Sequence, residues 1–400
     1  MLPGFPGGVD NISRGNGRSS NSPTSVARVT SAALPEPPDE AFASFPGVRA
    51  TSLVQCADLR KHPEALRSGW WAVVADFEGA ITGWNFTDVA RNVPDVTRTT
   101  GGFAAGVAGR WSGPDPASWR SSLDEEAYVA AVRRVRDAVR EGEVYQANIC
   151  RVLSAPLGSA AAEPDAAALT AVLAAGNPAP HAGTVHVPVG TAERAAWVVS
   201  ASPELFLSVR DGRVVSGPIK GTATRPEDLG EKDRAENVMI TDLVRNDLQR
   251  VCLPGTVEVL ALCAVEQHPG LVHLVSRVGG TLRGPLDAAG WSSLLDATLP
   301  PASVSGAPKS SALRLIAELE TAARGPYCGG VGWIDADAGR AELAVGIRTF
   351  WWTPPATDGP GTLRFGTGAG ITWGSDPEAE WRETELKAAR LVALASQPRR

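Results

Sequence analysis

The sequence has few cysteines and no long apolar run, and both shortages exclude classes of protein. Its 400 residues contain five cysteines, an odd number, without a Cys-x-x-Cys pair or the Cys/His spacing of a zinc site. We interpret them as reduced, mostly buried thiols of a cytoplasmic protein. No stretch of eighteen apolar residues occurs, so we expect no membrane span.

Positive charge is also in short supply. The chain has 38 Lys and Arg against 44 Asp and Glu, a formal net charge of −6. Proteins that bind nucleic acid usually carry a basic surplus or a basic stripe, so we expect no nucleic-acid partner. A small anionic substrate is still allowed, because a few local charges can hold it whatever the global balance.

The composition that is present indicates a well-packed soluble protein with an unusual start. Hydrophobic residues make up 43% of the chain and charged residues 20%. Residues 1–45 are rich in Gly, Pro, Ser and Asn and lack the apolar centre of a signal peptide, which predicts a flexible leader.

Helix and strand signals are interspersed along the rest of the chain. The apolar run 70–75 predicts a buried strand. A capping box, Ser122-x-x-Glu125, predicts a helix that Gly142 ends, and a strand is expected at 144–149. Further helices are expected at 160–176, 231–248, 308–319 and 376–394, and further strands at 197–200, 205–209, 213–216 and 341–352. The order lacks the regular βαβ rhythm of a doubly wound sheet, which favours an α+β fold.

Two of the expected helices carry acidic residues three positions apart. Asp233 and Glu236 share one helix face, as do Glu380 and Glu383. If the two pairs face each other, their oxygens suit Mg²⁺, which prefers carboxylates and retains waters. The alternative is a solvated helix surface, since Glu383 also stands four residues before Lys387 in a favourable surface pairing.

Three further segments combine small residues with reactive or polar ones. In 216–222, Lys220 stands among backbone-permissive residues; it is either an exposed charge or a nucleophile whose pKa is lowered by desolvation. Segment 303–309 places hydroxyl groups at a helix start, as an anion site or as an ordinary cap. Segment 366–371 has three glycines but lacks the context of a dinucleotide fingerprint.

In this order, these segments resemble those of the chorismate-binding enzymes, a family with anthranilate synthase component I, aminodeoxychorismate synthase component I, isochorismate synthase and salicylate synthase among its members. The resemblance covers about two-thirds of the chain, from about residue 126 to about residue 394. Its blocks are GEVYQANI (142–149), ASPELFL (201–207), PIKGTATRP (218–226), DRAENVMITDLVRNDL (233–248), VHLVS (272–276), VSGAPK (304–309), GIRT (346–349) and GAGITWGSDPEAEWRETELK (368–387).

The resemblance implies a large β-sandwich core wrapped by helices, with the site in the cleft between the layers. Residues 46–120 would form the N-terminal part of the sandwich and 121–400 the chorismate-binding catalytic region. The same resemblance implies Mg²⁺ as cofactor. Its principal ligands would be Glu236 and Glu383. Asp233, where relatives often carry Glu, and Glu380 would support the ion through water.

The remaining site residues are carried over from the matched motifs. Glu204 resembles the general acid that protonates the leaving hydroxyl, and it must be partly buried or near other carboxylates to do so. His273 resembles the residue beside that hydroxyl, and Arg348 the one that pairs with a substrate carboxylate. Residues expected to line the same pocket are Gln146, Ser305, Tyr327, Gly370 and Lys387.

Two positions choose among the relatives. Members that add water carry a Lys base where this chain has Gln146, so water activation is disfavoured here. Anthranilate synthases read PIAGT where this chain has PIKGT, and the Lys220 position is the mark of aminodeoxychorismate synthases. Lys220 resembles the lysine proposed to attack C2 of the chorismate ring as hydroxide leaves C4, before ammonia enters at C4. Such a lysine must be neutral, so its pKa must be lowered.

The chain lacks the GxCxG elbow and the His-x-Glu pattern of a glutaminase, so no ammonia source is evident in it. The resemblance implies a separate glutamine amidotransferase subunit that delivers ammonia. We therefore expect conversion of chorismate and ammonia to 4-amino-4-deoxychorismate for p-aminobenzoate and folate synthesis. The enzymatic alternative is anthranilate synthase component I. The alternative of another class is a non-catalytic chorismate-binding protein.

Overall fold

The computed structural model describes residues 40–93, 107–108, 110–159, 162–223, 225–268 and 271–396. Most of the predicted leader lies outside these residues, but its last part is structured. Phe42–Phe45 form strand β1, which pairs antiparallel with both β2 (Val48–Asp58) and β7 (His181–Val187). The sandwich therefore begins before residue 46, and the described residues form one compact unit.

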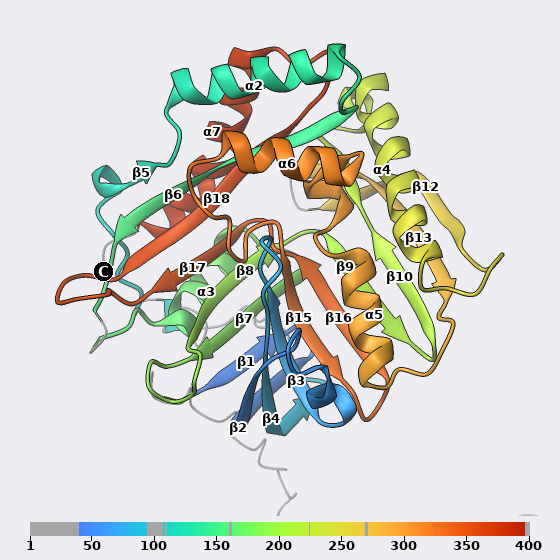
Figure 1. The fold of residues 1–400 in the computed structure, drawn as a ribbon. Helices are drawn as coiled ribbons and strands as arrows, with labels where there is room; N and C mark the ends of the chain where they lie inside the picture. Colours follow the sequence, from blue (N-terminus) through green and yellow to red (C-terminus); the bar gives the residue numbers. More distant parts are fainter. Residues whose placement is uncertain are drawn as a thin grey trace, which may run out of the picture. The chain divides into compact units, whose positions relative to one another are not determined.

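The strands extend from β1 in two arms, and every pairing between the described strands is antiparallel (Figure 1). The first arm runs in the order β2, β4 (Ile81–Arg91), β3 (Trp70–Ala75), β15 (Gly330–Asp335), β16 (Arg340–Val345), β9 (Leu205–Arg210), β10 (Arg213–Gly217) and β13 (Leu271–Thr281), with β11 (Ile219–Ala223) and β12 (Glu258–His268) also paired to β13. The second arm runs in the order β7, β8 (Ala196–Ser202), β17 (Thr349–Thr353), β18 (Thr362–Ile371) and β6 (Gln146–Pro156), with β5 (Arg120–Ser121) and β14 (Gly306–Ala307) paired to β6.

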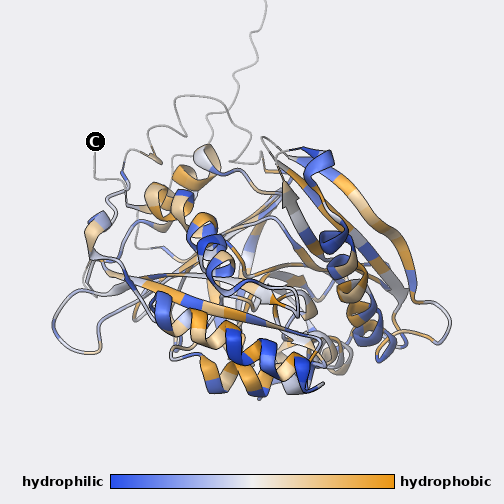
Figure 2. Cartoon of the chain, turned by 90° about the horizontal axis from the view of Figure 1, so that it is seen from above, coloured by the Kyte–Doolittle hydropathy of each residue, from blue (hydrophilic) through white to orange (hydrophobic). Residues whose placement is uncertain are grey.

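Helices cover both arms and show hydrophilic and hydrophobic stripes (Figure 2). The second arm packs against α2 (Glu125–Arg140), α3 (Ala166–Gly176), α6 (Lys309–Leu319) and α7 (Pro377–Ala395). The end of the first arm packs against α4 (Glu231–Gln249), and α4 in turn contacts α5 (Ala288–Thr298). The 3₁₀ turns are η1 (Pro63–Arg67), η2 (Pro116–Ser118), η3 (Pro226–Asp228) and η4 (Ala302–Val304).

Two hydrophobic cores and a third, small cluster at β13 result from this packing. The larger core contains Trp71, Phe86, Tyr128 and Trp291, and the smaller core lies under α3 and α7 and includes the buried Leu169. The predicted α+β fold with a helix-wrapped antiparallel sandwich is confirmed. All five cysteines are free, as predicted, and three of them are buried.

Several predicted element boundaries are confirmed and others are wrong. Strand β3 has its predicted bounds, α4 ends one residue later than predicted, and α7 begins and ends one residue later. The capping box is wrong: the side chain of Asp124 caps α2 through the Ala127 N–H at 2.9 Å, while the Ser122 hydroxyl accepts from the Val152 N–H. Helix α3 begins at residue 166 rather than 160, because the side chain of Asp165 caps it there.

The predicted strand 341–352 is two strands. β16 ends at Val345 and β17 begins at Thr349. Arg348, between them, has a left-handed backbone with φ 52°, which a non-glycine residue adopts at a cost. The alternating apolar pattern carries no signal for such a turn, so periodicity alone joined the two strands.

Candidate active site

The far ends of the two arms meet at Gly370. Strand β18 carries Gly370, β6 carries Gln146 and β11 carries Lys220. A Cβ on Gly370 would lie 3.2 Å from Lys220 Nζ and would overlap the Gln146 amide. Only glycine leaves room for both polar groups. The glycine-rich segment 366–371 was expected to be a loop, but it belongs to strand β18, where its neighbours require glycine.

Lys220 is the centre of the charged groups gathered here. Its side chain keeps some exposed surface. Protein packed around the ammonium lowers its pKa, although the carboxylates of Glu236, Glu204 and Glu383 oppose that shift; Lys387 adds to it. The direction is the one that a nucleophilic lysine requires, and the interactions show that α4, α7, β11 and the start of β9 bring these side chains together.

Glu204 is the most perturbed carboxyl in this group. It immediately precedes β9 and is 3% exposed. Burial raises its pKa to about 7, while hydrogen bonds from the Ser303 hydroxyl and the Ile219 N–H and the charge of Lys220 act in the opposite sense. A carboxyl with this pKa is protonated in a substantial fraction of molecules near neutral pH, as a general acid must be.

The acidic residues of α4 and α7 lie near one another. Burial raises the pKa of Glu236, and the charges of Glu380 and Asp233 raise it further. Burial also raises the pKa of Glu380, with a contribution from Glu383. For Glu383, burial is outweighed by Lys387, whose Nζ lies 2.7 Å from Oε1, and the pKa is lowered. The two predicted acidic pairs therefore face a common region rather than separate surfaces.

The chemistry of this donor set fits a hard divalent cation such as Mg²⁺, which prefers carboxylate oxygens. The carboxylates do not yet surround a common point: within the described ranges, no three His, Cys, Asp or Glu side chains form a cluster that could hold a metal ion. Lys232 Nζ lies 3.7 Å from Glu380 and 3.9 Å from Glu236 and supplies counter-charge there. Asp233 accepts a hydrogen bond from the Gly230 N–H at 2.9 Å, so one of its oxygens caps α4.

Arg348 is a half-buried cation whose ion-pairing capacity is free. Burial lowers its pKa, and the salt bridges among the described residues include none to its guanidinium. Its strained backbone is held by a hydrogen bond from the Ala201 N–H to its carbonyl at 3.0 Å. A half-buried guanidinium without a protein carboxylate is suited to bind an anionic ligand.

The other predicted site residues divide into two groups. His273 is 2% exposed on β13, opposite Thr222 of β11, and Lys387 donates to the Gly368 carbonyl at 3.0 Å, so both lie on the strands and helix that form the site. Ser305 and Tyr327 are engaged elsewhere. The Ser305 hydroxyl donates to the Pro301 carbonyl within its own turn.

Tyr327 packs its ring on Gly366, and its hydroxyl lies 3.8 Å from the Cys150 thiol. The residue that sequence reasoning missed is Ser303. It lies in the same polar motif as Ser305, but its contact with Glu204 joins segments one hundred residues apart, which no local pattern reveals.

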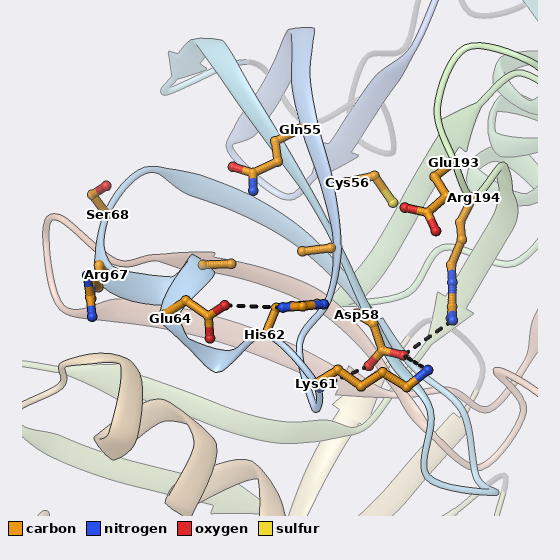
Figure 3. A pocket seen from close by; sticks show the side chains of 12 residues that line it. Gln55, Cys56, Asp58, Lys61, His62, Glu64, Arg67, Ser68, Glu193 and Arg194 are labelled. Atoms are coloured by element: carbon orange, nitrogen blue, oxygen red, sulfur yellow. Dashed lines mark hydrogen bonds and ion pairs between the residues drawn. The ribbon is translucent and has the colours of Figure 1, made fainter.

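A cavity lies away from this site. It measures about 680 Å³ and is lined by β2, η1 and the pair Glu193 and Arg194 (Figure 3). Asp58 lies 3.5 Å from Lys61 and 3.3 Å from Arg194 there. No predicted site residue lines it. A second cavity of about 20 Å³, room for one water, lies beside Glu204, Ser303 and Asp247.

Fold and site together define an α+β protein that gathers a lysine, a buried carboxyl and two acidic pairs where two sheet arms meet. A family profile described as chorismate binding enzyme matches residues 104–393, and the chain belongs to this family. None of the helices in the described ranges is long and apolar enough to cross a membrane.

Relatives of known name support the assignment. The chain is 44% identical over 207 residues to anthranilate synthase component 1 of Saccharolobus solfataricus, covering 49% of this chain and 47% of that one. It is 38% identical to the Thermus thermophilus protein of the same name, covering 72% and 60%. It is 34% identical to aminodeoxychorismate synthase component 1 of Klebsiella aerogenes, covering 69% and 59%. The matches thus span about half to three-fifths of these relatives' lengths.

A solved structure shows the same fold. The chain superposes on anthranilate synthase component I from Streptococcus pneumoniae with a TM-score of 0.68 at 21% identity, covering 92% of this chain and 95% of that chain. At this identity the likeness establishes the architecture, and the chemistry must be argued from the side chains.

Proposed function

We propose that this protein transfers ammonia to C4 of chorismate to give 4-amino-4-deoxychorismate, as aminodeoxychorismate synthase component I does. The observation that carries the proposal is Lys220: a lysine with a lowered pKa stands against Gly370, within the electrostatic reach of Glu204. A lysine that only carried charge on a surface would not be enclosed in this way.

Lys220 and Glu204 supply complementary halves of the first step. The neutral Lys220 amine forms a bond to C2 of the ring, both conjugated ring double bonds shift toward C4, and the C4–oxygen bond breaks. Glu204 gives its proton to the departing oxygen, which leaves as water. In the second step ammonia bonds to C4, both double bonds shift back and the C2–nitrogen bond to Lys220 breaks, which restores the lysine.

The free cation Arg348 would hold a substrate carboxylate while this occurs. A guanidinium grips a carboxylate through two parallel hydrogen bonds and so fixes the ring's orientation. The remaining burial around Lys220 and Glu204 keeps bulk water from the reacting atoms.

Gln146 supports ammonia rather than water as the nucleophile. Its Oε1 is buried, and no donor in the described part of the chain reaches it. An amide oxygen accepts a hydrogen bond but does not remove a proton at neutral pH, so it can orient ammonia yet cannot activate water. A buried acceptor without a partner costs free energy, which a bound N–H donor would recover.

Mg²⁺ is the cofactor that we propose for the acidic pairs. Glu236 and Glu383 would bind it directly, with Glu380 and Asp233 acting through water. When bound, the ion would hold the C1 carboxylate and withdraw negative charge from the ring. Lys232 and Lys387 now supply positive charge to these carboxylates, and they must release them to admit the ion.

Glu383→Ala should weaken Mg²⁺ binding by a factor on the order of 100 and reduce amination in proportion, because a directly bound oxygen is lost. Calorimetric titration of the chorismate-bound protein with MgCl₂ measures the first effect and product formation the second. Glu378→Ala, on the same helix but paired with Arg133 at the surface, is the matched control. Unchanged Mg²⁺ affinity in Glu383→Ala would remove α7 from the metal site.

Anthranilate synthase component I is the second candidate, and the names of the relatives favour it. The anthranilate synthases of S. solfataricus and T. thermophilus are 44% and 38% identical to this chain, against 34% for the aminodeoxychorismate synthase of K. aerogenes. That activity adds elimination of pyruvate on the same scaffold. The relatives' designation as component 1 supports a separate glutamine amidotransferase partner for either activity.

Product identification separates the candidates. Purified protein is incubated with chorismate, Mg²⁺ and an ammonium salt at mildly alkaline pH, and the products are separated and weighed by chromatography and mass spectrometry. Aminodeoxychorismate, which an added lyase converts to p-aminobenzoate, supports the proposal. Anthranilate supports the second candidate, and saturable chorismate binding without turnover supports a non-catalytic binding protein.

A further inference from the structure

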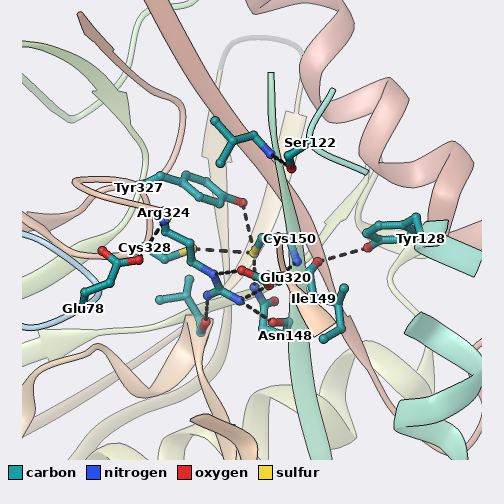
Figure 4. Close-up of polar contacts among 12 residues, drawn as sticks. Glu78, Ser122, Tyr128, Asn148, Ile149, Cys150, Glu320, Arg324, Tyr327 and Cys328 are labelled. Carbon is teal, nitrogen blue, oxygen red and sulfur yellow. Dashed lines mark hydrogen bonds and ion pairs between the residues drawn. The ribbon is translucent and has the colours of Figure 1, made fainter. Parts of the chain in front are cut away.

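A fully buried guanidinium lies behind the site. Arg324 is 1% exposed, and each of its three head-group nitrogens donates to a protein acceptor (Figure 4). It donates to both carboxylate oxygens of Glu320 at 2.6 and 2.8 Å, to the Val304 carbonyl at 3.0 Å and to the Asn148 carbonyl at 2.6 Å. Its Cζ lies 4.0 Å from the centre of the Phe77 ring. We call these five residues the Arg324 cluster.

The Arg324 cluster joins segments that are distant in the sequence. Glu320, at the end of α6, also accepts the Cys150 N–H at 2.8 Å, so β6 is held at two points. The Arg324 backbone N–H donates to Glu78, which follows β3, at 2.7 Å. The cluster thus fixes β6, the η4 turn, α6 and the turn after β3 relative to one another.

Two of the bound carbonyls adjoin residues of the candidate site. Val304 follows Ser303, which lines the same small cavity as Glu204 and whose hydroxyl acts on the Glu204 carboxyl. Asn148 lies two residues after Gln146 and directly opposite Gly370 in the register of β6 and β18. The guanidinium therefore spans the distance between the Ser303 side of the site and the Gln146 side.

We propose that Arg324 is a positioning residue for the reaction: it holds the η4 turn that presents Ser303 to Glu204, and the β6 strand that presents Gln146, at one fixed spacing. The inference rests on the proposed function for the roles of Glu204 and Gln146. An arginine is needed because a rigid planar fork can bind three acceptors in different directions at once. A lysine has one flexible point charge and cannot reproduce that geometry.

Arg324→Lys should detach the Val304 carbonyl and loosen the Ser303 contact with Glu204. The Ser303 hydrogen bond opposes the rise in the Glu204 pKa that burial causes, so its loss should raise that pKa by about one unit. The groups that face Glu204 from other elements, Lys220 of β11 and the Asp247–Lys309 pair of α4 and α6, are retained in the variant. We further expect kcat to fall about 10- to 100-fold with KM for chorismate within about threefold.

The test is a titration of Glu204 in the full-length protein without substrate. Protein labelled with ¹³C at the glutamate carboxyl carbons is titrated by NMR, and the Glu204 resonance is identified by its loss in Glu204→Gln. Ser303→Ala gives the shift expected when the hydrogen bond is removed directly. Leu169→Ala, in the smaller hydrophobic core, is the control for general destabilisation and should leave the Glu204 titration unchanged.

A Glu204 titration in Arg324→Lys that moves toward that of Ser303→Ala confirms the positioning role. A titration identical to that of the unaltered protein overturns it, whatever reaction the protein catalyses, because the NMR readout needs no turnover. If Arg324→Lys does not fold, Glu320→Gln decides: it keeps the shape of the cluster, and the proposal predicts a smaller shift in the same direction. No shift in Glu320→Gln would overturn the proposal.

Discussion

Lys220→Ala should reduce kcat for amination by a factor on the order of 1,000 while KM for chorismate changes little. The substitution removes the nucleophile of the first step and leaves Arg348 and the acidic pairs to bind the substrate, so the loss falls on the reaction rather than on binding. Steady-state kinetics with an ammonium salt measure both constants. Lys61→Ala is the control, since that lysine is largely exposed and lies at the distant cavity.

The outcome also separates the two candidate functions. Alanine is the residue that the PIAGT motif of anthranilate synthases carries at this position. If the chain were an anthranilate synthase, Lys220→Ala should retain most of its turnover and should release anthranilate. Near-normal formation of aminodeoxychorismate by Lys220→Ala would instead remove the lysine from the mechanism and leave direct attack of ammonia on C4.

Glu204→Gln should lose most of its amination activity and yet be more stable than the unaltered protein at alkaline pH. Glutamine cannot donate the proton that the leaving hydroxyl needs, but it removes a buried carboxyl that must ionise in a poorly solvated position. Burial raises the pKa of Glu204 from 4.5 to about 7. A folded-state pKa above the unfolded value contributes stability below about pH 4.5 that is lost as the pH rises through about 7.

The expected change of stability with pH has a definite sign and size. The free energy of unfolding of the unaltered protein should fall by about 2–3 kcal/mol between pH 5 and pH 8.5, relative to that of Glu204→Gln. Urea unfolding followed by circular dichroism at both pH values measures the difference. Glu378→Gln, an exposed surface change, should show no such trend. Parallel pH profiles for Glu204→Gln and the unaltered protein would mean that Glu204 ionises normally in the fold.

The same titration predicts how activity depends on pH. Amination needs Lys220 neutral and Glu204 protonated. Burial lowers the pKa of Lys220 below the ordinary lysine range and raises that of Glu204 to about 7, so the two pKa values move toward each other. The pH profile of kcat/KM should therefore be bell-shaped, with one limb near pH 7 and the other below the ordinary lysine range. Coupling through their opposite charges makes the two limbs properties of the pair.

Prediction from the sequence was most accurate for features that depend on the residue pattern of a single helix or strand. The periodicity of α4 and α7 predicted both helices within a residue, and the three-residue spacing predicted which carboxylates share a face. It was least accurate where a contact joins distant segments. Ser305 was expected in the pocket, but its hydroxyl closes its own turn, and Ser303 contacts Glu204 instead.

Unusual backbone conformations could not be predicted from the residue pattern either. Nothing in residues 341–352 distinguishes the left-handed conformation of Arg348, which the surrounding strands impose. Asp233 was expected near the metal, and one of its oxygens is used to cap α4, a local role that its position at the helix start allowed in advance. The Arg324 cluster was missed altogether, because a buried arginine is recognised only when its acceptors are assembled.

The choice of reaction depends on fewer residues than the choice of family. Similarity averaged over hundreds of positions reports the scaffold, which several chorismate enzymes share. In the proposed mechanism the chemistry depends on Lys220, which supplies the nucleophilic amine, and on Gln146, which leaves water without a base. The relatives' names therefore indicate the family, and these two side chains indicate the reaction. Identification of the products decides between the two candidate reactions.

Strand β1 has a practical consequence for anyone who shortens this protein. A version that begins at residue 46, where the glycine- and proline-rich start of the sequence gives way, would lack the one strand that is hydrogen-bonded to both β2 and β7. The two arms would then lose their shared edge, and each would expose unpaired backbone N–H and C=O groups that favour aggregation. Trimmed versions made for expression or crystallisation should therefore keep residues 40–45.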